Sequence, residues 1–145
     1  MPNDIKEIIL RAARRRGVAT TLVANKPVWI GEGDFVSFVH VTAGPDVADS
    51  YIVDTSAAGD LCITADIPLA ARVVAKGLIA IDPRGDLYSE ESIGERLAIR
   101  DFMAGLRDSG VQTGGPAPFN QKAKQRFAAQ FDTILTRALR DQTGG

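Results

Sequence analysis

Apolar and polar positions follow one another along the chain in blocks that predict an alternation of helices and strands. Near the N-terminus, Ile5, Ile8, Ile9 and Ala12 recur at the spacing of an amphipathic helix, and Gly17 is placed to end it. Further along, short apolar runs bounded by polar residues or glycine predict strands over residues 20–24, 35–41, 61–65 and 78–81. Helices are expected over residues 46–58, 68–76 and 90–108 and from about residue 120 onward.

This alternation is typical of an α/β fold. We expect three layers, in which a mainly parallel sheet of four recognisable strands is flanked by helices on both faces. The chain has 145 residues, which suits one domain with a real core. The sequence therefore predicts a single domain over residues 1–145, with a helical C-terminal part from about residue 89.

Charge and cysteine content narrow the class of protein. The 17 lysines and arginines almost balance the 18 aspartates and glutamates, so any basic surface must be local. The single cysteine, Cys62, lies within an apolar run and excludes a disulfide within the chain. No targeting segment or long apolar stretch occurs, and we expect a soluble cytoplasmic protein without a membrane partner.

Acidic residues at strand ends are the first candidates for chemistry. Asp66 follows the apolar run 61–65 and precedes Pro68, so we expect it in a strand-to-helix turn at the edge of the sheet where ligands bind. An alternative interpretation is that Asp66 caps the helix. Asp46 and Asp49 follow another strand and share one helical face, which suits a hard cation such as magnesium, but first-turn acids also simply favour the helix dipole. Asp82 ends the last predicted strand.

Arginines are the second group of candidates. Arg84 lies in a glycine turn after the last strand, where its guanidinium suits a phosphate; pairing with Asp86 or Glu95 is an equally good interpretation. A row of arginines on the helix over residues 90–108 matches a phosphate backbone, although such a row is often only a solvated face. This row comprises Arg96, Arg100 and Arg107.

Five segments together resemble the YaiI/YqxD family of bacterial proteins over nearly the whole chain. They read Gly-Pro-Asp-Val-Ala-Asp at 44–49, Thr-Ala-Asp-Ile-Pro-Leu-Ala at 64–70, Pro-Arg-Gly-Asp-Leu-Tyr at 83–88, Ile-Gly-Glu-Arg-Leu-Ala-Ile-Arg-Asp at 93–101 and Thr-Gly-Gly-Pro at 113–116. That family has no established activity, but its fold is thought to resemble PIN-type nucleases. Those enzymes gather acidic side chains around magnesium or manganese to hydrolyse RNA or DNA.

The resemblance implies a metal-dependent phosphodiester hydrolase that acts on RNA or DNA. Its catalytic residues and metal ligands would be Asp66, Asp46 and Asp49. Its substrate would be bound by Arg84, Arg96 and Arg100. Two other functions fit the residues: a non-catalytic module that binds nucleic acid or protein, and a domain that acts on a small phosphorylated ligand.

One departure from the family pattern concerns the N-terminus. Members usually begin with a strand similar to Ile-x-Val-Asp-Ala-Asp-Ala-Cys-Pro, which carries two aspartates and is central in PIN-like sheets. This chain has Met1 where that cysteine would lie. We expect either that the strand is encoded upstream of Met1 or that the acidic site is damaged.

Overall fold

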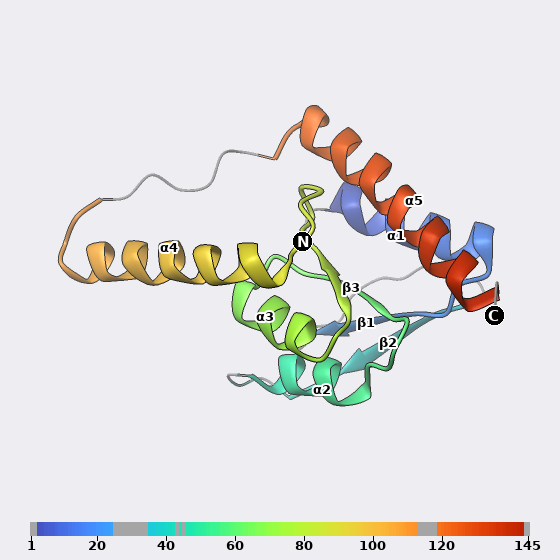
Figure 1. Cartoon of the computed structure of the whole chain (residues 1–145), viewed down its shortest axis with the longest axis horizontal. Coiled ribbons are helices and arrows are strands. Elements are labelled where there is room, and N and C mark those ends of the chain that lie inside the picture. Colours follow the sequence, from blue (N-terminus) through green and yellow to red (C-terminus); the bar gives the residue numbers. More distant parts are fainter. Residues whose placement is uncertain (1–2, 25–34, 43, 45, 113–118, 144–145) are drawn as a thin grey trace. The chain divides into compact units, whose positions relative to one another are not determined.

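The computed structural model describes residues 3–24, 35–42, 44, 46–112 and 119–143 (Figure 1). The chain divides into two compact units, Met1–Ser56 and Ala57–Gly145, and each is described by itself. The sequence-based expectation of a single domain over residues 1–145 stays a prediction.

The described residues of the first unit form two helices and one pair of parallel strands. Along β1 and β2, Thr20 lies opposite Val36 and Ala24 lies opposite His40. The elements in chain order are α1 (Asn3–Arg16), β1 (Thr20–Ala24), β2 (Val36–His40) and α2 (Val47–Thr55).

Helix α1 forms where the apolar spacing predicts it. Ile5, Ile9 and Ala13 lie on its buried face, each at most 5% exposed. The helix ends at Gly17, whose φ of 67° lies in the left-handed region that glycine adopts without a Cβ penalty. The expected helix and its C-terminal stop are therefore confirmed.

The part of the second unit that the structure describes forms another parallel pair and three helices. Leu61 lies opposite Ile79 and Ile63 lies opposite Ile81, and helix α3 connects the two strands and packs on β4 and α4. The elements are β3 (Leu61–Ile63), α3 (Ile67–Ala75), β4 (Ile79–Ile81), α4 (Glu90–Asp108) and α5 (Gln121–Thr143).

Most buried apolar residues of the second unit come from α3, β4 and α5, and Leu78 and Tyr88, on either side of β4, are buried with them. Val73, Ile81 and Phe127 are fully buried, and the rings of Phe127 and Phe131 stack with centroids 5.3 Å apart. This core holds the carboxyl ends of β3 and β4 in place.

A tight hairpin follows β4 and reverses the chain. Ile81 forms an antiparallel bridge with Leu87, and the backbone N–H of Asp82 donates to the carbonyl of Asp86 at 2.8 Å. We call residues 82–86 the β4 turn. Because the returning segment runs beside β4, the side chains that follow the turn lie at the edge of the β3–β4 pair.

Helix α4 begins beside α3 and extends beyond it (Figure 1). Its first turn is fixed by a capping box in which Ser89 and Ser92 satisfy each other's backbone N–H groups. None of its 19 residues is buried. Ile99, Phe102 and Met103 are 52%, 65% and 39% exposed, and we call these three residues the apolar stripe of α4.

The α/β class and the parallel pairing of the predicted strands are confirmed, and α4 has the bounds predicted for it. The four strands form two pairs, β1–β2 and β3–β4, among the described residues. Strand β3 is shorter than predicted because Thr64 and Asp66 already belong to the turn that starts α3. The glycine-rich segment at 113–116 lies outside the described residues, and no helix among those described combines the length and the apolar character needed to cross a membrane.

Candidate functional site

Asp66 lies in the turn between β3 and α3 and caps that helix. Its Oδ1 accepts a hydrogen bond from the backbone N–H of Leu69 at 3.0 Å, and Pro68 occupies the first turn. The backbone N–H of Asp66 itself donates to Oγ1 of Thr64 at 3.0 Å. The capping interpretation of Asp66 is thus confirmed, while its side chain stays exposed at the strand end.

Thr64 links this cap to the segment that returns from the β4 turn. The backbone N–H of Thr64 donates to the carbonyl of Ile81, and its own carbonyl accepts from the Tyr88 hydroxyl at 3.1 Å. The same hydroxyl lies 3.3 Å from Oδ2 of Asp82. Tyr88 therefore joins the ends of β3 and β4, across 24 residues of sequence.

Asp82 is the buried carboxylate of this edge, with a side chain that is 9% exposed. Its Oδ1 accepts from the backbone N–H of Arg84 at 2.6 Å, and its Oδ2 lies 3.4 Å from Nη2 of Arg96. The Arg96 guanidinium also lies over the Tyr88 ring, 4.5 Å from its centroid. Asp82 and Tyr88 together hold the Arg96 side chain in one position.

Burial raises the pKa of the Tyr88 hydroxyl to about 12. Burial is the largest cause of this net increase; the neighbouring Asp82 carboxylate contributes to it because it opposes a second negative charge, while the Arg96 guanidinium acts in the opposite direction. Tyr88 is consequently a neutral hydrogen-bond donor at physiological pH.

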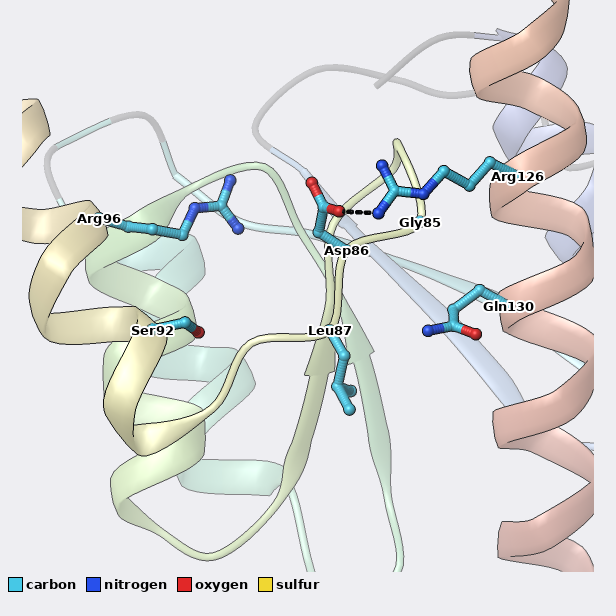
Figure 2. Close-up of a pocket in the computed structure, with 7 residues that line it drawn as sticks. All are labelled: Gly85, Asp86, Leu87, Ser92, Arg96, Arg126 and Gln130. Atoms are coloured by element: carbon cyan, nitrogen blue, oxygen red, sulfur yellow. Dashed lines mark hydrogen bonds and ion pairs between the residues drawn. The ribbon is translucent and has the colours of Figure 1, made fainter.

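Arg96 also lines a pocket of about 340 Å³ between the β4 turn, α4 and α5 (Figure 2). A second guanidinium, that of Arg126 on α5, enters the pocket from the opposite side, and Asp86 lies between the two (Figure 2). We call it the Arg96–Arg126 pocket. Its lining residues are Gly85, Asp86, Leu87, Ser92, Arg96, Arg126 and Gln130.

The pocket wall is fixed where the β4 turn meets α5. Nη2 of Arg126 donates a hydrogen bond to Oδ1 of Asp86. Gly85 has a φ of 94°, and a Cβ at this position would lie 3.1 Å from the backbone carbon and oxygen of Arg126. Glycine allows this close approach without strain, and the approach places Asp86 against Arg126.

Asp46 and Asp49 belong to the first unit, whereas Asp66 belongs to the second. Asp46 precedes α2 in the left-handed conformation, with a φ of 64°, and its side chain makes no capping hydrogen bond. The Asp46 carboxylate therefore does not cap α2. Asp49 lies in the first turn of α2, as its sequence position predicts.

No metal-ligating cluster is present among the described residues: they contain no group of three or more histidine, cysteine, aspartate or glutamate side chains suited to an ion. Asp66 alone does not make a ligand set for magnesium or manganese. The metal hypothesis for Asp66, Asp46 and Asp49 stays a prediction.

The predicted substrate-binding arginines have different surroundings. Arg96 lines the pocket, as described above. The Arg84 guanidinium lies 6.0 Å from the centroid of the Phe119 ring. Arg100 forms an exposed ion pair with Asp101 on α4 at 3.3 Å.

Sequence reasoning missed Arg126 and Tyr88. Arg126 lies 40 residues beyond its partner Asp86, and no local spacing connects them. Tyr88 follows the β4 turn by two residues, and a polar aromatic residue directly after a hairpin is the one signal in the sequence that could have indicated it.

Comparison with known proteins assigns the chain to a family. The model of an uncharacterized bacterial family, YaiI/YqxD, matches residues 1–137. A UPF0178 protein of Trichlorobacter lovleyi is 53% identical over 140 residues, which cover 97% of this chain and 91% of the relative. UPF0178 proteins of Geobacter sulfurreducens and Klebsiella pneumoniae strain 342 are each 54% identical, over 96% and 97% of this chain and 93% of each relative. No solved structure matches. The chain belongs to the YaiI/YqxD family.

Proposed function

We propose that this protein binds a phosphate group of a phosphorylated ligand in the Arg96–Arg126 pocket. The observation that carries the proposal is the presence of two guanidinium groups in one pocket, accompanied by the neutral polar side chains of Ser92 and Gln130. A guanidinium presents a planar fork of N–H donors that matches two oxygens of a phosphate. The Gln130 amide supplies further donors, while the Ser92 hydroxyl is hydrogen-bonded within the capping box.

The position of Arg96 supports the proposal energetically. Its guanidinium is already held by the Asp82 carboxylate and the Tyr88 ring. A side chain that is ordered before binding loses little conformational entropy when the ligand arrives. Arg96 thus acts as a preformed anion contact, whereas Arg126, whose side chain is 62% exposed, adapts to the ligand.

Calorimetric titration with inorganic phosphate in metal-free buffer tests this function. We expect Arg126→Gln to weaken phosphate binding by roughly tenfold or more, because a charge-assisted hydrogen bond is lost. Arg137→Gln is the matched control, since Arg137 is an exposed arginine of the same helix outside the pocket lining. Equal phosphate affinity in the wild type and both variants would contradict the proposal, as would a wild type that binds no phosphate.

Metal-dependent hydrolysis of RNA or DNA is a second function that we propose for the same sheet edge. It is supported by the exposed carboxylate of Asp66 at the end of β3, which Thr64 and Tyr88 connect to Asp82 and Arg96. Since the described residues supply no complete ligand set for magnesium or manganese, no catalytic step is assigned to the metal.

The hydrolase proposal is tested by incubating the protein with single-stranded RNA and manganese. Asp66→Asn is the informative variant because the asparagine side-chain oxygen still caps α3. Loss of cleavage in this variant and in the presence of a chelator supports the proposal, while equal cleavage contradicts it. RNA binding that falls with salt and needs neither Asp66 nor metal would instead indicate a non-catalytic binding module.

A further inference from the structure

Each arginine of the pocket is paired with an aspartate, but the two aspartates differ in surroundings. Asp82 is almost buried, and its oxygens already face the Arg84 backbone N–H, the Tyr88 hydroxyl and Arg96. The Asp86 side chain is 43% exposed and lines the pocket itself. A ligand in the pocket therefore meets the carboxylate of Asp86.

The two oxygens of Asp86 also differ. Oδ1 accepts the hydrogen bond from Arg126. The other oxygen is turned away from Arg126, toward the side from which Arg96 enters (Figure 2). A carboxylate oxygen is only an acceptor, so a ligand atom that approaches it must carry a hydrogen.

The pocket consequently offers donors and an acceptor side by side. The Arg96 and Arg126 guanidinium groups attract phosphate oxygens, while Asp86 repels any bare oxygen that comes near it. Because Gly85 packs directly on the Arg126 backbone, the β4 turn keeps Asp86 in this place.

We infer that Asp86 is a specificity-determining residue that selects ligands in which a phosphate group carries, or directly neighbours, an O–H donor. This inference rests on the phosphate-binding function proposed above. Hydrogen phosphate and phosphate esters with adjacent hydroxyl groups satisfy both the arginines and Asp86. Sulfate and phosphate esters without hydroxyl groups leave the Asp86 carboxylate facing an acceptor, which is unfavourable.

Hydrogen phosphate and sulfate provide a direct test at about pH 8, where both carry two negative charges and only phosphate retains a hydrogen. We expect the wild type to bind phosphate at least about tenfold more tightly than sulfate, because one charge-assisted hydrogen bond replaces a repulsion. In Asp86→Asn the amide supplies a donor, so sulfate affinity rises and the preference for phosphate falls to near unity. Asp101→Asn removes one exposed negative charge of α4 outside the pocket lining and is expected to leave the preference unchanged.

A second comparison needs no variant. Glycerol 3-phosphate and propyl phosphate carry the same charge and differ in two hydroxyl groups, and we expect the former to bind several-fold more tightly to the wild type. Equal binding of these two esters together with an unchanged phosphate preference in Asp86→Asn would overturn the role of Asp86. In that case phosphate binding that still depends on Arg126 leaves the proposed function standing, whereas absence of all phosphate binding rejects both.

Discussion

The guanidinium carbon of Arg96 lies 4.5 Å from the centroid of the Tyr88 ring, and the Tyr88 hydroxyl lies 3.3 Å from the carboxylate that also pairs with Arg96. Tyr88 thus supports Arg96 with its ring and Asp82 with its hydroxyl. The geometry of the pocket depends on a residue that does not line it.

The raised pKa of Tyr88 predicts that the folded protein loses stability at alkaline pH. Its pKa is raised from 10.0 to about 12 in the folded protein, so the stabilisation is fully present below pH 10 and is lost as the pH rises toward 12. The difference between these two pKa values corresponds to about 3 kcal/mol of unfolding free energy. Urea unfolding curves at several pH values across this interval measure it.

Tyr88→Phe is the control for this pH dependence. It removes the ionisable hydroxyl but retains the ring beneath Arg96, so its unfolding free energy should change less with pH over the same interval. A variant that loses stability between pH 10 and 12 as steeply as the wild type would show that another group is responsible.

The hydrogen bond by which Asp66 caps α3 is expected to contribute measurably to the unfolding free energy. Replacing it by alanine removes the acceptor of the Leu69 N–H bond and should lower the unfolding free energy by about 1 kcal/mol. Asp66→Asn retains an acceptor and should lose much less. Chemical denaturation of the wild type and the two variants measures these differences. An alanine variant as stable as the wild type would show that the cap does not stabilise the protein.

The backbone conformation and close packing of Gly85 predict that any side chain at this position destabilises the folded protein. Gly85→Ala combines an unfavourable φ of 94° with a Cβ located 3.1 Å from the Arg126 backbone, and we expect it to lower the unfolding free energy by about 2 kcal/mol or more. Phosphate affinity should fall with it, because the turn positions Asp86 and α5.

Two other glycines separate the causes of this effect. Gly77 has a φ of 86° and open space around its Cβ position, so Gly77→Ala measures backbone strain alone. Gly94 lies inside α4 with open space, and Gly94→Ala should stabilise the protein by up to about 1 kcal/mol. If Gly85→Ala lowers the unfolding free energy no more than Gly77→Ala does, the close approach to Arg126 does not contribute to the loss of stability.

The buried and exposed phenylalanines predict opposite responses to truncation. Phe127 is fully buried and stacked on Phe131, so Phe127→Ala should cost about 3–5 kcal/mol of unfolding free energy. Phe102 is 65% exposed, and Phe102→Ser should change this quantity by less than about 0.5 kcal/mol. A large loss at Phe102 in thermal or chemical unfolding would mean that its ring is covered in solution.

Local features of the fold could be predicted because their causes are local in sequence. The cap formed by Asp66 depends on a backbone N–H group three residues away, and the stop at Gly17 depends on its own φ. The arrangement of the four described strands as two pairs could not be predicted, because strand order depends on packing between distant segments.

The candidate site divides in the same way. The positions of Asp66 and Asp82 at strand ends follow from the apolar runs that precede them. The residues Asp86 and Arg126 are 40 positions apart, and Tyr88 and Thr64 are 24 positions apart. Neither contact could be predicted from the spacing of residues in the sequence. The family resemblance pointed to Asp66 as a metal ligand and to Arg96 as a substrate-binding residue, but gave no indication of Arg126 or of the pocket that it forms with Arg96.

The apolar stripe of α4 has a consequence for how this protein behaves in solution. Ile99, Phe102 and Met103 lie on the same helix as Arg96, which lines the pocket. Raising the salt concentration screens the attraction between arginines and anions, but strongly excluded salts such as sulfate strengthen contacts between exposed apolar surfaces. Adding such a salt therefore favours both the release of the bound anion and the association of the protein with itself. The two effects are separated by repeating the titration at several protein concentrations.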